Sequence, residues 1–484
     1  MKSPLHTLLC LLAVAAFQKF GFDAKAANGK PVWELAQPPV RVVPGAPKYS
    51  DVAVRSLIRR PANAKDPYDT FRMAQEFHVT RLDWCYGVDR AYVQRAKELG
   101  LVIGAAMGSN MPDAKGKRDT GRVTDKNGNL VTYKWMAPGI WAGCPNAPEY
   151  RAIWLQYTTN YLAAGVDLIQ QDDPAMSTRT TSLCYCKYCT AAFSKYQSKH
   201  GPNASYEQFQ QDSVAAFHRE MHAQLDTIAG RHIPFSHNNA IGFHGKLDWS
   251  APLFDFVNAE IESRNVQPAE LFKIATISRT NGIPMLFQYR DTSVPNNRRT
   301  LATIYANGMN MLMPWDVYMP DNAPRYFGTK EQYADLSGFI RANAKWLDGY
   351  EHAFAYGPKV TGKNPAATPV KLEGGSGNAY AYVRAQPGNA KAPVVIHLVE
   401  WEQQGKPGKL LIRKASFWGE QKVTATLRVP PAYDASLHDK AQSSGDFSSL
   451  AKAIKLTPVP AGEWLSFDIP TLNPWGIVVI QLDK

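Results

Sequence analysis

The chain has 484 residues, of which 45% are hydrophobic and 20% are charged, and its formal net charge is +12. This composition is typical of a folded globular protein and excludes a disordered or collagen-like chain. The basic residues are scattered, which argues against a nucleic-acid partner, although the positive charge is compatible with an acidic polysaccharide.

The first 26 residues have the pattern of a signal peptide. Lys2 precedes the apolar run Leu8–Phe17, and Ala24-Lys25-Ala26 offers small residues at the positions that a signal peptidase reads. Removing three lysines and one aspartate with this segment lowers the net charge from +12 to +10. No later run is long and apolar enough for a membrane helix. We expect an exported, periplasmic or extracellular protein with no membrane association.

Residues 51–347 alternate short apolar runs with amphipathic stretches, which predicts a mostly parallel sheet with crossover helices. The expected strands cover residues 52–58, 79–84, 101–106, 167–171, 233–236, 254–259, 285–288 and 309–313. The expected helices cover residues 67–77 (capped by Asp66), 90–99, 149–163, 187–200, 206–229, 269–280, 297–306 and 330–347. Eight such units predict a (β/α)8 TIM barrel over residues 27–350. The alternative, a doubly wound sheet, lacks a glycine-rich phosphate fingerprint after its first strand.

After residue 350 the sequence changes to short alternating strands separated by Pro, Gly, Lys and Thr. Expected strands include residues 379–383, 394–399, 423–429, 464–469 and 476–482. We therefore predict an all-β sandwich over residues 351–484. It either binds carbohydrate or packs on the barrel as a structural domain.

The active site of a TIM barrel lies at the C-terminal ends of its strands. The predicted strand ends carry carboxylates, amides, a histidine and aromatic side chains, which together suit a sugar substrate. Expected substrate-binding residues are Asp83, Trp84, Tyr86, His237, Asn238, Asn258, Gln288, Arg290, Trp315 and Asp316. Of these, Asp83 and Asp316 have an alternative role in holding loops.

Glycoside hydrolysis needs two carboxyl groups across the scissile bond. The fourth strand ends in the pair Asp172 and Asp173, and the sixth ends at Glu260 and Glu262. Because side chains alternate along a strand, we favour Asp172, which shares a face with Gln170, and likewise Glu260 over Glu262. The hypothesis is retaining hydrolysis of an oligo- or polysaccharide, with the aspartate as nucleophile and Glu260 as acid/base. The alternatives are a non-catalytic carbohydrate-binding barrel and a polysaccharide lyase or deacetylase.

Five of the six cysteines follow the signal segment, and three of them have the spacing Cys184-x-Cys186-x-x-Cys189. An odd number argues against a framework made only of disulfides. Three thiolates need a fourth ligand for tetrahedral zinc, and Cys144 is the candidate. The alternative is one disulfide with a free thiol, which export favours. No organic cofactor is expected.

This cysteine pattern, with an acid before it and His200-Gly201 after it, resembles the family 42 β-galactosidases and related glycosyl hydrolases over about residues 130–202. The resemblance implies a structural zinc on Cys144, Cys184, Cys186 and Cys189. It does not extend to the catalytic residues, because Asp172-Asp173 stands where the family has Asn-Glu. The seventh strand also lacks the family's nucleophilic Glu. The layout is closer to α-galactosidases and α-L-fucosidases, whose nucleophile is an Asp on the fourth strand.

Overall fold

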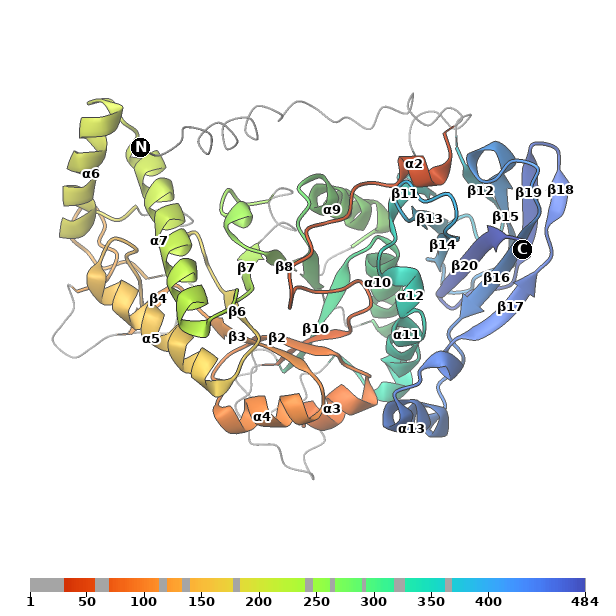
Figure 1. Cartoon of the computed structure of the whole chain (residues 1–484), viewed down its shortest axis with the longest axis horizontal. Helices are drawn as coiled ribbons and strands as arrows, with labels where there is room; N and C mark the ends of the chain where they lie inside the picture. The colour runs from red at the N-terminus through yellow and green to blue at the C-terminus, as the bar shows by residue number, and fades with distance from the viewer. Residues whose placement is uncertain are drawn as a thin grey trace.

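A computed structural model describes residues 30–56, 69–112, 120–132, 140–176, 183–239, 247–261, 266–289, 293–316, 327–361 and 368–483. Eight parallel strands close into a barrel in the order β1-β10-β9-β8-β7-β6-β3-β2, and two antiparallel sheets follow it (Figure 1). The predicted TIM barrel with a C-terminal β domain is therefore confirmed. Within the described ranges, no helix has both the length and the apolar character needed to cross a membrane.

The barrel is built from the following elements. Its strands are β1 (Ala53–Ser56), β2 (Arg81–Cys85), β3 (Val102–Met107), β6 (Leu168–Gln171), β7 (Phe235–Asn239), β8 (Phe256–Glu260), β9 (Met285–Gln288) and β10 (Asn310–Asp316). The helices around it are α3 (Thr70–Glu76), α4 (Arg90–Glu98), α5 (Pro148–Ala164), α6 (Lys187–His200), α7 (Tyr206–Ala229), α9 (Pro268–Thr280), α10 (Val294–Ala306), α11 (Lys330–Ala342) and α12 (Ala344–Leu347).

Two local expectations about the barrel were wrong. Helix α3 begins at Thr70 and is capped by Asp69, whose carboxylate accepts hydrogen bonds from the backbone of Phe71 and Arg72. The expected cap, Asp66, lies outside the described residues. The long connection after β3 also contains a small antiparallel pair, β4 (Asn110–Pro112) and β5 (Ile140–Ala142).

The interior of the barrel is filled rather than open. Apolar side chains from the strands form one buried cluster, made of Ala53, Trp84, Ala106, Leu168, Phe256, Leu286 and Leu312. Such layers are the normal packing of a TIM barrel, which leaves chemistry to the strand ends. Any ligand site of this barrel must therefore be sought at its mouth.

The C-terminal region is an antiparallel sandwich. One sheet has the order β11 (Glu351–Tyr356), β13 (Ala379–Ala385), β14 (Val394–Glu400), β20 (Trp475–Leu482), β16 (Val423–Val429) and β17 (Lys452–Leu456). The other has the order β12 (Val370–Gly374), β15 (Gly408–Arg413), β19 (Trp464–Ile469) and β18 (Val459–Ala461). Both sheets contribute to one hydrophobic core, for example through Ile396 and Leu410.

Two helical segments join this sandwich to the rest of the chain. The short α2 (Val32–Leu35) lies against β11 and β13, and its Val32 and Trp33 belong to the sandwich core (Figure 1). Sequence reasoning placed both residues in the barrel unit. A helix that was not expected, α13 (Ala435–Ser444), packs on α3. There the His78 and His438 rings are joined by a 2.7 Å hydrogen bond.

Because His78 and His218 are buried, we expect the protein to lose stability in mild acid. Burial lowers the pKa of both His78 and His218 to about 4, whereas an unfolded chain protonates histidine near pH ~6.5. Between these values the unfolded state binds more protons, so the stability present above pH ~6.5 is lost as the pH falls towards about 4. Urea midpoints measured across this interval should fall steadily. The variant His218→Gln should show a shallower fall, and an unchanged slope would contradict the assignment.

Candidate active site

Two carboxylates meet at the mouth of the barrel, joined by one amide. Asp172 directly follows β6, Glu260 ends β8, and Asn238 lies on β7 between them. The Asn238 Nδ2 donates to Asp172 Oδ1 at 2.9 Å and to Glu260 Oε2 at 3.2 Å. These oxygens therefore cannot be farther apart than 2.9 Å plus 3.2 Å, or 6.1 Å.

The Asp172 carboxylate is held by donors on both oxygens. The Tyr86 hydroxyl donates to Oδ2 at 2.5 Å, and the Asp173 backbone N–H donates to Oδ1 at 3.0 Å. Tyr86 in turn accepts a 3.1 Å hydrogen bond from the Trp84 indole. These contacts fix the direction of the carboxylate while its side chain stays partly exposed. An oriented and accessible carboxylate is what a nucleophile requires.

Glu260 is held by an amide and a buried guanidinium. Its Oε1 accepts from Gln288 Nε2 at 3.3 Å and lies 3.7 Å from Arg55 Nη1. Arg55 also donates to Gln288 Oε1 at 2.5 Å, and its guanidinium carbon lies 3.7 Å from the centre of the Trp84 ring. The Arg55 side chain is fully buried, whereas that of Glu260 is 33% exposed. Glu260 is thus held by contacts on its barrel side, and its exposed part is accessible to a ligand at the mouth.

Sequence reasoning missed Arg55. The first strand was expected within residues 52–58, without a defined end, and β1 ends at Ser56, one residue after Arg55. The usable signal was an arginine directly after the apolar run Val52-Ala53-Val54, because a buried arginine needs partners of the kind found at a barrel mouth.

The turn that carries Asp172 is strained and fixed by buried partners. Asp173 has a φ of 50°, in the left-handed region, where strain persists only if the surroundings enforce it. The Ser109 hydroxyl donates to the backbone oxygens of both aspartates, and His218 Nε2 lies 2.9 Å from the oxygen of Pro174. Asp173 itself is buried. Of the adjacent pair, Asp172 is therefore the one available to a ligand.

Two predicted sugar ligands lie deeper in the barrel. Asp83 is fully buried and accepts from Arg81 Nε at 2.5 Å. Asn258 is also fully buried and donates to Gln170 Oε1 at 2.5 Å. Both belong to polar layers beneath the mouth. They support the site from below and have no surface for a sugar to contact.

Other predicted residues point outwards or fall outside the described chain. His237 stacks on Phe254 at 4.7 Å, and Trp315 packs edge-on against Phe77 at 5.9 Å, so both face the helical layer. Glu262 and Arg290, and the side chain of Asp316, lie outside the described residues. The predicted residues that the structure brings together at the mouth are Asp172, Glu260, Tyr86, Asn238 and Gln288, with Trp84 beneath them.

The four predicted cysteine ligands form one buried cluster. The sulfurs of Cys144, Cys184, Cys186 and Cys189 all lie within 4.8 Å of one another. Cys144 Sγ is 3.5 Å from the sulfurs of both Cys186 and Cys189. The described cysteines, including Cys85, are free thiols rather than disulfides. The expectation that the upstream cysteine joins the triplet is confirmed.

The donor set and its spacing fit tetrahedral zinc. Sulfurs of such a site lie about 3.8 Å apart, given Zn–S bonds of about 2.3 Å. Hydrogen bonds from the other three thiols hold the pKa of Cys186 well below its usual range, which favours the thiolate that a metal binds. The Asn146 amide donates to Cys189 Sγ at 3.3 Å, an outer contact of the kind that orients metal ligands. The cluster would anchor the first turn of α6 to the Cys144 segment before α5.

Comparison with known proteins supports the fold. The sequence matches no protein-family model, and no curated protein is significantly similar to it. The α-L-fucosidase isoenzyme 2 from Paenibacillus thiaminolyticus superposes with a TM-score of 0.54 at 10% identity, over 90% of this chain and 100% of that one. The maltogenic α-amylase AmyB from Thermotoga neapolitana gives 0.53 at 8% identity, over 90% and 99%. At these identities the likeness shows that the chain shares the overall fold of these enzymes.

Proposed function

We propose that this protein hydrolyses O-glycosidic bonds of an oligo- or polysaccharide by a retaining mechanism, with Asp172 as nucleophile and Glu260 as acid/base. The observation that carries the proposal is the pair of carboxylate oxygens bridged by Asn238, no more than 6.1 Å apart. Retaining enzymes place their carboxyl groups about 5–5.5 Å apart, and inverting enzymes about 6.5–9.5 Å. This bound lies nearer to the retaining range and therefore supports the retaining mechanism.

In the first step an Asp172 oxygen attacks the anomeric carbon and forms a glycosyl ester. The bond from that carbon to the leaving oxygen breaks, and protonated Glu260 gives its proton to that oxygen. In the second step Glu260 takes a proton from water, and the water oxygen attacks the anomeric carbon. The ester bond breaks, Asp172 regains its charge, and the sugar keeps its original configuration.

The surrounding residues position these two groups. The Tyr86 hydroxyl and the Asn238 amide aim the Asp172 carboxylate, and Asn238 also sets its spacing from Glu260. Arg55 and Gln288 hold the other Glu260 oxygen.

The structural neighbours agree with this class of reaction. The two described above are named as a fucosidase and an amylase, and both names denote enzymes that act on sugars. The resemblance to family 42 covers the cysteines and leaves out its catalytic residues. We therefore do not propose β-galactosidase activity.

The stereochemistry of the first product tests the mechanism. Proton NMR of a hydrolysis started with an aryl glycoside that the protein accepts should show a product with the same anomeric configuration as the substrate. Mutarotation follows only later. A first product of opposite configuration would overturn the retaining assignment. Saccharide binding without turnover would instead identify a carbohydrate-binding barrel, and an unsaturated or deacetylated product would identify a lyase or a deacetylase.

Two further proposals concern the rest of the chain. We infer that the protein is exported to the periplasm or beyond, because residues 1–26 combine a positive start, a short apolar run and a small-residue cleavage pattern. We also infer that the four-cysteine cluster holds a structural zinc, because its ligand type and sulfur spacing suit that metal.

A further inference from the structure

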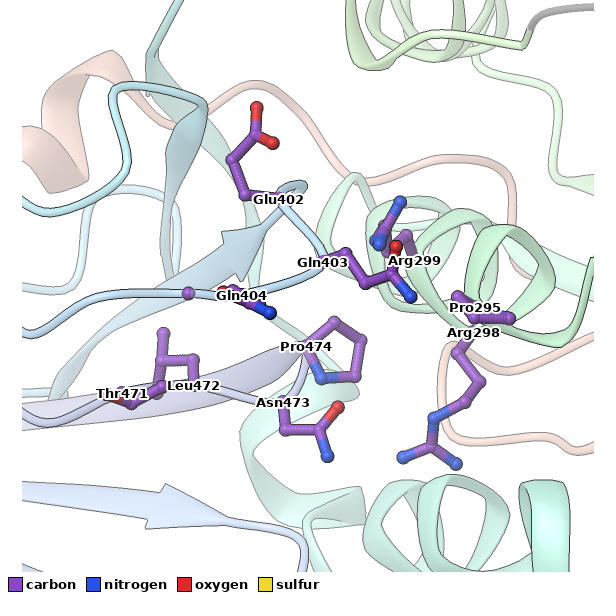
Figure 2. A pocket seen from close by; sticks show the side chains of 11 residues that line it. Pro295, Arg298, Arg299, Glu402, Gln403, Gln404, Thr471, Leu472, Asn473 and Pro474 are labelled. Atoms are coloured by element: carbon purple, nitrogen blue, oxygen red, sulfur yellow. The ribbon is translucent and has the colours of Figure 1, made fainter.

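A hollow lies where the barrel meets the sandwich. Its volume is about 320 Å³, and it is bounded by the first turns of α10, by residues 402–405 after β14 and by residues 471–474 before β20. Figure 2 shows the Pro474 ring at its centre, with Gln403 and Arg299 above the ring and Asn473 below it. This volume lies in the range of small-ligand sites, which occur preferentially where domains meet.

The walls of this hollow are fixed by buried contacts. The Trp401 indole donates to Thr303 Oγ1 of α10 at 2.9 Å, which ties residues 402–405 to the barrel. The Glu400 backbone N–H donates to the oxygen of Pro474 at 2.8 Å and joins the two sandwich loops. Because the walls come from both units and are tied together, the hollow is preformed.

Three amides and one arginine of the lining are available to a ligand, whereas the lining carboxylate of Glu402 already accepts from Asn378 Nδ2 at 3.0 Å. Within the part of the chain that the structure describes, the exposed side-chain amides of Gln403, Gln404 and Asn473 make no hydrogen bond to protein. Among the described residues, the Arg299 side chain makes one hydrogen bond, at 3.4 Å to Asn296 Oδ1. By contrast, the neighbouring Arg298 is already held by two hydrogen bonds to the Asp335 carboxylate, at 2.7 and 2.6 Å.

This set of groups matches a saccharide. Side-chain amides both donate and accept, as neighbouring sugar hydroxyls require, and a guanidinium donates to hydroxyl or carboxylate oxygens. The Pro474 ring and Leu472 add a small apolar surface for the C–H face of a sugar. The same groups could bind neutral or acidic sugars. Arg299 would contact a hydroxyl in a neutral sugar and a carboxylate in an acidic one.

The hollow also lies on the same side of the barrel as the two carboxylates. Helix α10 starts after β9, whose last residue, Gln288, contacts Glu260. Pro295 at the hollow lies seven positions after Gln288 in the chain, so the two residues cannot be more than about 25 Å apart. One extended saccharide can span such a distance.

We propose that this hollow is a second saccharide-binding site, which holds a distant part of the same polymeric substrate whose bond is cleaved at Asp172. The proposal rests on the proposed function for its link to catalysis. It makes the natural substrate a polysaccharide rather than a short glycoside.

Affinity gel electrophoresis of the full chain tests the proposal. The experiment uses the Asp172→Asn background, so that bound polymer is not consumed. Polygalacturonate and alginate serve as acidic probes, and glucomannan and dextran as neutral ones. We expect at least one polymer to retard the protein. The double variant Gln403→Ala/Gln404→Ala and the variant Arg299→Ala should each weaken that binding roughly 2- to 10-fold, as expected for lost hydrogen bonds.

A matched variant controls for general surface effects. Gln421→Ala removes an exposed amide outside the hollow and should leave the retardation unchanged. If only the acidic polymers retard the protein, Arg299 binds a sugar carboxylate. If only the neutral polymers do so, Arg299 binds sugar hydroxyls. Equal retardation of all variants, or no retardation by any polymer, would overturn the proposal. Because binding is read without turnover, this result is independent of whether hydrolysis itself is confirmed.

Discussion

Replacing Asp172 by Asn is expected to lower turnover of an accepted aryl glycoside by about 10⁴-fold or more, as is usual when a covalent nucleophile is removed. The amide cannot form the glycosyl ester, yet it has the shape of the carboxylate, and its oxygen can still accept from the Asn238 amide and the Asp173 backbone N–H. The fold should therefore be retained, and circular dichroism should confirm this. The measurement is kcat/KM against wild type.

Two further variants separate the role of Asp172 from that of its neighbours. Asp173→Asn changes an adjacent but buried carboxyl group and should cost much less activity. Asp172→Gly opens space in which azide can attack the anomeric carbon, so azide should restore turnover and yield a glycosyl azide of inverted configuration. Near-normal activity of Asp172→Asn, or a greater loss in Asp173→Asn, would show that the nucleophile is wrongly assigned.

Replacing Cys189 by Ser is expected to reduce bound zinc from about one ion per chain to almost none and to lower the melting temperature by several degrees. A structural zinc site contributes its binding energy directly to folding, so three remaining ligands hold the metal far less tightly. Metal content is measured by mass spectrometry of the purified protein, and stability by thermal unfolding with and without a chelator.

Cys85 provides the control for this experiment. It is equally buried but lies on β2, where its sulfur contacts the Asp83 backbone oxygen at 3.5 Å. Cys85→Ser should therefore keep its zinc. A wild-type protein without metal, in which alkylation and mass analysis find a disulfide among the four cysteines, would contradict the zinc assignment.

The sequence predicts helices of this fold well where their ends are marked by residues with a local preference. Helix α7 has the predicted bounds because Ser205 caps its start and Gly230 adopts a left-handed conformation at its end. Helix α6 likewise ends before Gly201. By contrast, α13 was missed because it interrupts a region whose other segments alternate as strands.

The residues at the mouth were harder to predict, because a shift of one residue along a strand moves a side chain from the rim of the barrel to its interior. Asp83 was expected at a strand end, but β2 continues to Cys85. The pairing of β2 with β3 also shifts register between Leu82 and Cys85. This irregularity turns Trp84, at a φ of 56°, into the barrel interior. Simple alternation of side chains cannot anticipate such a shift.

Residues at the end of β6 followed the alternation rule more closely. Gln170 and Asp172 both lie on the inner side, where they meet Asn258 and Asn238 respectively. The cysteine cluster needed a different kind of information. Its triplet spacing indicated a metal site, but the contribution of Cys144, far away in sequence, depended on a resemblance and then on the fold.

The position of α2 changes how the two units should be understood. Trp33 stacks beside Trp418 at 5.5 Å, and its backbone oxygen accepts from Gly388, so the segment before the barrel completes the core of the domain after it. In topological terms the barrel is an insertion within a discontinuous sandwich. A cut at residue 350 would separate two parts of one hydrophobic core rather than two domains. We therefore expect complete folding of the sandwich to depend on chain from both sides of the barrel.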